Sequence, residues 1–98
     1  MSYNGVKSLR IKIRLYGLLK DLTGSNELSL EIPVESTHLR DILEELVRRY
    51  PSLNTYISVK DGSIQVRGLS ILVNGQHAMF LGGDMAEIKD GYVIDILP

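Results

Sequence analysis

The sequence predicts an α+β fold, in which a mixed sheet of four to five strands packs one main helix on one face. Near the start of the chain, hydrophobic residues alternate with polar ones, which is the pattern of a strand with one buried face. In the middle, hydrophobic residues recur at steps of three and four, the period of an amphipathic helix. Further short apolar runs of strand length follow that segment. A helix with one apolar stripe needs a sheet face to bury it, so these observations predict two packed layers.

The first two strands are predicted on either side of a turn. Residues 9–16 alternate apolar with basic or aromatic side chains, and residues 27–32 alternate apolar with polar ones until Pro33, which lacks a backbone donor. Between them, residues 23–26 (Thr-Gly-Ser-Asn) have turn chemistry. We expect the arginine and lysine side chains of the first strand to pair with glutamates of the second.

The main helix is predicted from one apolar stripe: Leu39, Ile42, Leu43, Leu46, Val47 and Tyr50. Ser36 or Thr37 is expected to cap the first turn, and Asp41 complements the positive end of the helix dipole. Pro51 marks the end, because the residue before a proline is driven out of helical geometry.

The second half of the sequence gives weaker signals. Residues 52–68 are polar, and the short alternation at 64–66 is either a small strand or an ordered loop. Residues 70–73 predict a strand that ends at the tight turn Asn74-Gly75. Asp90-Gly91 then leads into a final strand within residues 92–98. A helical crossover allows such a late strand to run parallel to an early one, as in a β-grasp, although other small α+β folds also satisfy this order.

Composition excludes several function classes. The 98 residues suit a single domain spanning 1–98, and 11 basic against 12 acidic residues argue against direct nucleic-acid binding. The chain has no cysteine and only two histidines, which argues against disulfides and metal sites. No nucleophile–base pair or phosphate loop is recognisable, so an enzyme is disfavoured. No signal peptide or membrane-spanning run is visible, and we expect a cytoplasmic protein.

Three stretches resemble a known family: residues 11–24, residues 39–51, and Val73-Asn74-Gly75 together with Lys89-Asp90-Gly91. In order and spacing they resemble the sulfur carriers MoaD and ThiS, the archaeal ubiquitin-like modifiers and the eukaryotic ubiquitin-related modifier. The resemblance implies a ubiquitin-like β-grasp. It also implies a carrier rather than an enzyme, one that binds no cofactor of its own.

The chemistry that the resemblance implies takes place at a C-terminal Gly-Gly. An E1-like adenylating enzyme uses ATP to activate the carboxylate, which then becomes a thiocarboxylate or a conjugate. Other implied partners are the molybdopterin synthase large subunit, or conjugation targets and the proteasome, and the implied pathways include molybdopterin biosynthesis and tRNA thiolation. The printed chain ends at Pro98, so we expect a tail beyond it. The alternative is a tail-less ubiquitin-like binding module that docks to the same partners without being activated.

The internal Gly82-Gly83 is interpreted as a turn and not as a hidden reactive diglycine. Cleavage after this pair would remove the predicted final strand. His38 is likewise assigned a structural or solvent-exposed role, because no partner for ligand or base chemistry is apparent.

The predicted partner-binding residues are Tyr16, Leu97, Leu72, Arg14 and His77. Strand alternation places Arg14 and Tyr16 on the sheet face opposite the helix, and Leu72, Val93, Asp95 and Leu97 are expected beside them. An aromatic, arginines and aliphatic groups together have the composition of a docking patch, whereas the alternative is an ordinary solvated face. The resemblance implies docking through this face. His77 stands where better-known members have an apolar residue, and no catalytic or metal-binding residue is assigned.

Overall fold

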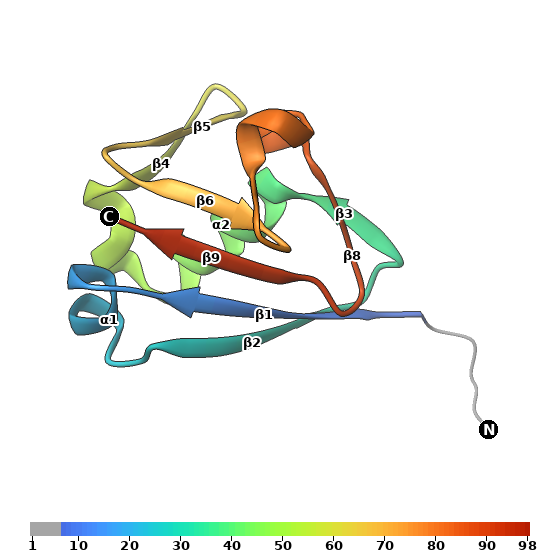
Figure 1. The fold of residues 1–98 in the computed structure, drawn as a ribbon, viewed down its shortest axis with the longest axis horizontal. Helices are drawn as coiled ribbons and strands as arrows, with labels where there is room; N and C mark the ends of the chain where they lie inside the picture. Colours follow the sequence, from blue (N-terminus) through green and yellow to red (C-terminus); the bar gives the residue numbers. More distant parts are fainter. Residues whose placement is uncertain (1–6) are drawn as a thin grey trace.

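The computed structural model describes residues 7–98 and has a five-stranded mixed sheet at its centre, in the order β2-β1-β9-β6-β7. The bounds of these strands are β1 (Leu9–Leu15), β2 (Glu27–Ile32), β6 (Ser70–Val73), β7 (Gln76–His77) and β9 (Val93–Leu97). β1 is antiparallel to β2 and parallel to β9, which in turn is antiparallel to β6. The first and last strands of the chain therefore lie side by side in the middle of the sheet (Figure 1).

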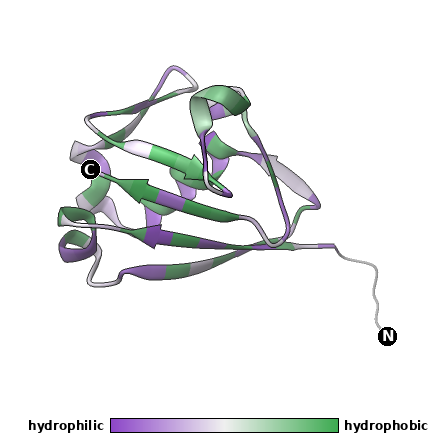
Figure 2. Ribbon diagram, in the orientation of Figure 1, coloured by the Kyte–Doolittle hydropathy of each residue, from purple (hydrophilic) through white to green (hydrophobic). Residues whose placement is uncertain are grey.

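One main helix, α2 (Leu39–Arg49), packs on one face of this sheet, which confirms the predicted layers (Figure 1). Its buried side chains are Leu39, Ile42, Leu43 and Leu46, and the inward residues of β1 are Leu9, Ile11, Ile13 and Leu15. β1 alternates between hydrophobic and hydrophilic residues along its length, whereas β6 and β9 are mainly hydrophobic (Figure 2). The apolar side chains of β1, β6 and β9 therefore share one core with those of α2.

The start of α2 differs from the prediction, because the capping position is His38 and not Ser36 or Thr37. Residues Ser36–His38 are extended as β3, which pairs with β8 (Glu87–Lys89), so the helix begins later than local capping signals suggest. The Asp41 carboxylate accepts the backbone N–H of His38 at 3.3 Å and the hydroxyl of Thr37 at 2.7 Å. Asp41 thus stabilises this end of the helix, as its position predicted. At the other end, α2 stops before Pro51, also as predicted.

The connection between β1 and β2 contains a short helix, α1 (Leu18–Thr23), where the sequence predicted only a turn. Six residues are too few to show a helical period, and only Leu19 among them is buried. Gly24 closes α1 in the left-handed conformation, with φ at 76°. The predicted antiparallel pairing of β1 with β2 is nevertheless confirmed, from Leu9 opposite Ile32 to Arg14 opposite Glu27.

Residues 51–91 contain mostly short elements that flank the main sheet. A 3-10 turn, η1 (Pro51–Thr55), precedes a separate hairpin of β4 (Ile57–Lys60) and β5 (Ser63–Val66). Two further 3-10 turns, η2 (Ala78–Leu81) and η3 (Gly83–Met85), lie between β7 and β8. The uncertain alternation at 64–66 is therefore a strand.

The Gly82-Gly83 pair forms a turn, as predicted. Both residues have positive φ, at 107° and 64°, and they join η2 to η3. Cleavage after Gly83 would remove β9, which pairs with both β1 and β6. Within residues 7–98, no helix is long and apolar enough to cross a membrane.

Candidate docking site

Asp95 lies at the centre of the sheet face that points away from α2. In β9, the neighbours Ile94 and Ile96 belong to the core, so strand alternation turns Asp95 to the opposite side. The strand register places Arg14 of β1 on one side of Asp95 and Leu72 of β6 on the other. Two residues further along β9, Leu97 lies on the same face. The sequence predicted four side chains on this face, and the structure places them on the adjacent strands β1, β9 and β6: Arg14, Asp95, Leu97 and Leu72.

The Asp95 carboxylate holds two of its neighbours. Oδ1 accepts the Nε–H of Arg14 at 2.6 Å and the hydroxyl of Tyr16 at 2.8 Å, while Oδ2 accepts Nη2–H of Arg14 at 3.1 Å. A guanidinium that donates to both carboxylate oxygens forms a charge-assisted pair of fixed geometry. Asp95 is only 6% exposed, and it is the one charged residue that is buried within the described part of the chain.

The pKa values of these three groups shift together. Hydrogen bonding from Arg14 lowers the pKa of Asp95, with a smaller contribution from Tyr16, against the opposing effect of burial. The hydrogen bond that the Tyr16 hydroxyl donates to Asp95 is the main reason why the pKa of Tyr16 is raised. The hydrogen bonds that Arg14 donates to Asp95 likewise raise the pKa of Arg14. The ionised carboxylate, the guanidinium and the neutral phenol are therefore the forms that stabilise one another.

The other basic residues of β1 are paired with glutamates of β2, as predicted. Arg10 contacts Glu31 at 3.1 Å, and Lys12 contacts Glu27 at 3.7 Å. Arg14 is the exception, because it turns to Asp95 although the register places it opposite Glu27. These pairs balance the positive charge of β1, so the face does not present a basic stripe.

Tyr16 also adjoins the carboxyl end of the chain. Its backbone N–H donates to the carbonyl of Ile96 at 3.3 Å, and the next residue, Gly17, lies against Pro98. A Cβ on Gly17 would come within 3.1 Å of Pro98 Cγ, and the backbone there has φ 59° and ψ −131°, which side-chain-bearing residues rarely adopt. Glycine at position 17 thus allows the last residues to pass close beside Tyr16.

The apolar surface at this end of the sheet includes Tyr16, which is 39% exposed, and the partly exposed Leu97. Leu18, the first residue of α1, is 48% exposed and follows Tyr16 closely in the chain. Sequence patterns did not single out Leu18, because α1 itself was not predicted. The hydrophobic side chain of Leu18, in a connection that the sequence predicted as a turn, was the available signal.

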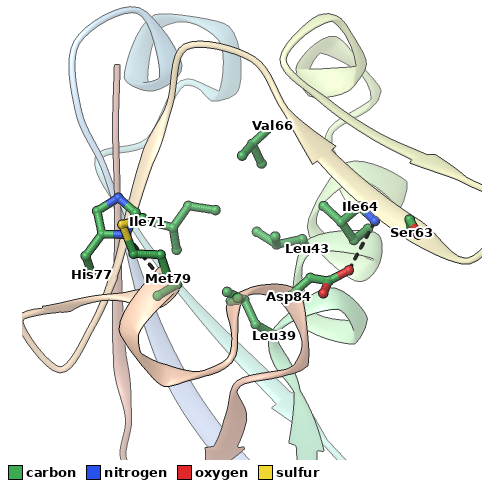
Figure 3. A pocket seen from close by; sticks show the side chains of 11 residues that line it. Leu39, Leu43, Ser63, Ile64, Val66, Ile71, His77, Met79 and Asp84 are labelled. Atoms are coloured by element: carbon green, nitrogen blue, oxygen red, sulfur yellow. Dashed lines mark hydrogen bonds between the residues drawn. The ribbon is translucent and has the colours of Figure 1, made fainter.

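His77 does not join the Arg14–Tyr16–Asp95 cluster. Its backbone lies opposite Leu72, but its side chain lines a separate hollow of about 380 Å³ on the helix side, with Ile71, Leu39 and Leu43 (Figure 3). Nδ1 of His77 accepts the backbone N–H of Met79 at 3.1 Å, so the ring caps the start of η2. This arrangement gives His77 a structural role, and its predicted part in docking stays a prediction.

The rim near this hollow carries exposed apolar side chains that were not among the residues predicted from the sequence. Met79 is 66% exposed and Phe80 is 79% exposed, and η2 is coloured as a hydrophobic turn in Figure 2. The ring of Phe80 meets His77 edge-on, with ring centroids 6.4 Å apart. The sequence signal for this exposed turn was a run of four apolar residues after a strand. A buried segment can have the same sequence pattern, so the pattern does not predict exposure. Within residues 7–98, no cluster of acidic and histidine side chains suits a metal ion.

Comparisons with known proteins agree with this fold. Residues 13–98 match the model of the ThiS family. The solution structure of small archaeal modifier protein 1 from Methanosarcina acetivorans is similar at 29% identity and a TM-score of 0.76, covering 94% of each chain. The CysO structure solved with BexX from Amycolatopsis orientalis is similar at 25% identity and a TM-score of 0.67, covering 90% of this chain and 93% of that one.

A third similar structure, small archaeal modifier protein 1 from Haloferax volcanii, has 20% identity and a TM-score of 0.75, covering 91% of this chain and 93% of that one. A comparison with curated protein sequences gave no match. The strand order and these likenesses confirm the ubiquitin-like β-grasp that the resemblance implied. Since the family model matches nearly the whole sequence, the chain belongs to the ThiS family.

Proposed function

We propose that this protein is a MoaD-like sulfur carrier or ubiquitin-like modifier that an E1-like adenylating enzyme activates at its C-terminal carboxylate. Membership of the ThiS family supports this function. The similar structures include archaeal modifier proteins and a CysO chain in complex with BexX, which supports a role that depends on a protein partner.

In the proposed reaction, an oxygen of the C-terminal carboxylate attacks the α-phosphate of ATP, and pyrophosphate leaves. A sulfide-level sulfur nucleophile then attacks the acyl carbon of the adenylate and displaces AMP, which gives a thiocarboxylate. Attack by a lysine amine at the same carbon displaces AMP and gives an amide conjugate. ATP is bound by the enzyme in this scheme. This chain contributes the carboxylate and the surface that brings it to the enzyme.

The observation that carries the proposal is the position of Tyr16 and Leu97 beside the carboxyl end of a central strand. β9 is held on both sides, by β1 and by β6, so the direction in which the chain leaves the sheet is fixed. Gly17, the residue after Tyr16, leaves room for Pro98. A partner that binds Tyr16 and Leu97 would therefore also hold the segment that leads to the reacting carboxylate.

The direct test compares the chain as printed with a form extended beyond Pro98 by a flexible segment ending in Gly-Gly. Each is incubated with ATP and a cognate E1-like enzyme, with and without a sulfur donor. We expect the extended form to release pyrophosphate and then to gain the mass of one sulfur in place of one oxygen. Absence of both adenylate and thiocarboxylate from the extended form would refute the carrier function.

The same assay addresses the alternative, a binding module that is not activated. Such a module would bind the enzyme in both forms and be adenylated in neither. It would also compete with an activated carrier for the enzyme. A fall in adenylation of that carrier, with no adenylation of the module itself, is the result that would support this alternative.

The docking part of the proposal is tested with Tyr16→Ala. We expect affinity for the activating enzyme to fall by about tenfold or more, as is usual when an interface aromatic is truncated. Val34→Ala is the matched control, because Val34 is also 39% exposed but lies in the connection between β2 and β3. Equal affinities of the Tyr16→Ala and wild-type proteins would exclude Tyr16 from the interface.

The finer assignments belong to the same proposal. A thiocarboxylate would serve molybdopterin synthesis, with a molybdopterin synthase large subunit as partner, or tRNA thiolation. An amide conjugate would mark target proteins, and the proteasome would then be a further partner. We propose the cytoplasm as the location of either route. Mass spectrometry of the activated chain after incubation with candidate acceptors distinguishes a transferred sulfur from an isopeptide bond.

A further inference from the structure

The burial of Asp95 needs a reason other than stability. Moving a carboxylate out of water is costly, and a buried ion pair often stabilises a protein no better than apolar residues of similar size. Asp95 lies on an otherwise solvated sheet face between Arg14 and Leu72, where an aliphatic residue would pack without that cost. Its three hydrogen bonds all go to side chains, those of Arg14 and Tyr16.

The effect of these hydrogen bonds is to fix two side chains that would otherwise move. Arg14 and Tyr16 are both substantially exposed, at 45% of the Arg14 side chain and 39% of Tyr16. Exposed side chains that become ordered only on binding weaken an interface by the conformational entropy that they lose. Because one carboxylate anchors both, the ring and the guanidinium are already oriented before a partner arrives.

The anchored guanidinium has unused hydrogen-bonding capacity. Arg14 uses Nε–H and one Nη2–H for Asp95, and the remaining N–H groups make no hydrogen bond within the described residues. These groups suit a carboxylate or a carbonyl oxygen on a partner, with a carboxylate the stronger acceptor. Next to them, the Tyr16 ring and Leu97 suit an apolar socket.

We propose that Asp95 is a positioning residue for docking: it holds Arg14 and Tyr16 as one preorganised unit, which favours an activating enzyme that offers an acidic acceptor beside an apolar socket. This inference rests on the proposed function. Asp95 acts through Arg14 and Tyr16 and touches neither ATP nor the reacting carboxylate.

The test uses the Gly-Gly-extended chain and its activating enzyme, and compares Asp95→Asn with Tyr16→Phe. Asparagine keeps the size of the side chain but loses the charge that binds Arg14, whereas phenylalanine keeps the ring and removes only the hydroxyl donor. Asp61→Asn is the matched control, because Asp61 lies in the turn between β4 and β5 and asparagine tolerates its positive φ of 53°. The combined variant completes a double-mutant cycle.

Two readouts are measured on each variant. The first is the ionisation of Tyr16, followed by NMR of the labelled ring, because Asp95→Asn should bring the raised pKa of Tyr16 back toward its ordinary value. The second is affinity for the enzyme, which should fall about tenfold in Asp95→Asn through the cost of ordering both side chains on binding. We expect a smaller loss in Tyr16→Phe and a non-additive cycle, with catalytic turnover at saturating carrier unchanged.

The outcomes separate this inference from the proposed function. If the wild-type chain is activated and Asp95→Asn binds equally well, the positioning role is refuted while the carrier function stands. If the wild-type chain is not activated, both fail together. Should Asp95→Asn be poorly folded, Tyr16→Phe decides, because unchanged affinity together with an unchanged Arg14 NMR signal would overturn the proposed unit.

Discussion

The buried side chains on the two sides of β9 have different surroundings, apolar on one side and polar on the other. On the side that faces α2, Ile94 and Ile96 are fully buried among other aliphatic residues. On the other side, Asp95 is nearly as buried, but it is surrounded by Arg14 and Tyr16, to which it is hydrogen-bonded. Adjacent residues of one strand are thus buried in an apolar environment in one case and in a hydrogen-bonded, charged one in the other.

Apolar burial on the inner side stabilises the fold, whereas the ion pair on the outer side orients the surface side chains. Burial of an isoleucine side chain contributes roughly 1.5–3 kcal/mol of favourable free energy without requiring any particular direction. A bidentate ion pair contributes less net stability but fixes directions and distances. Both kinds of residue lie on the strand that leads to the carboxyl end, so β9 connects the stable core to the face that we propose for docking.

Truncation of the inner side should have the largest effect. For Ile96→Ala we expect a loss of about 2–5 kcal/mol in the free energy of unfolding, because a fully buried side chain leaves a cavity. Urea denaturation of Ile96→Ala and of Leu97→Ala measures the contrast, since Leu97 points outward and is only partly buried. Equal losses in the two variants would contradict the division of β9 into two sides.

Gly17→Ala should have the next largest effect, at the point where the outer side meets the carboxyl end. We expect a loss of about 1–3 kcal/mol, the usual cost of a strained backbone conformation, increased by contact of the new methyl group with Pro98. Gly24→Ala is the control, because Gly24 also has positive φ but a Cβ there would meet nothing within 4 Å. Thermal denaturation that ranks Gly24→Ala as the more damaging variant would argue against the Gly17–Pro98 contact.

The ion pair on the outer side predicts a pH dependence. The pKa of Asp95 is lower in the folded protein than its ordinary value of 3.8, so its contribution to stability is complete above that value. The contribution is lost as the pH falls through the lowered pKa of the folded state. We expect Asp95→Asn to flatten the decline of unfolding free energy below about pH 4, measured by urea denaturation across pH.

Glu45 must be considered in the same experiment, because hydrogen bonds from Arg49 and Arg48 lower its pKa as well. The pH dependence that remains in Asp95→Asn should therefore diminish further when Glu45→Gln is added. A profile that Asp95→Asn leaves unchanged would mean that the Arg14–Asp95 pair makes no contribution to folding.

Removal of an exposed ion pair should have the smallest effect. Arg10 and Glu31 are 3.1 Å apart, but their side chains are 70% and 57% exposed. We expect Arg10→Gln to cost about 0.2–1 kcal/mol in unfolding free energy, because solvent screens such pairs. The cost should shrink further in high salt. A loss as large as that of Ile96→Ala would show that charge pairs on the outer side stabilise the fold after all.

Long periodic segments were the most predictable part of this molecule. The alternation in β1 and β2 and the apolar stripe of α2 were recognised because many residues repeat one pattern. β3 and β8 were not predicted, since a segment of three residues is too short to show a periodic pattern. Each is a strand only because it pairs with the other. For the same reason, β3 displaced the predicted helix cap to His38.

Alternation within single strands also predicted that Arg14, Tyr16, Leu72 and Leu97 share one face. It did not predict the burial of Asp95, although an acidic residue in an apolar strand, beside a basic strand, was a usable signal. The ionic partner of Asp95 depends on which strands are neighbours and in what register. For His77, the strand register favours the face of Leu72, but its ring accepts the backbone N–H of Met79 and lines the hollow beside Leu39 and Leu43.

By itself, the sequence determined the main strands, the helix and the side of each strand that is buried, because these follow from local periods of apolar residues. The resemblance to sulfur carriers also came from residues in sequence order. Only the tertiary structure decided that β9 lies between β1 and β6, that Arg14 turns from Glu27 to Asp95, and that Gly17 meets Pro98. The contacts of Arg14 and Gly17 with the last residues join positions about eighty apart, and the pairing of β9 with β6 also spans several elements, so no local pattern specifies them.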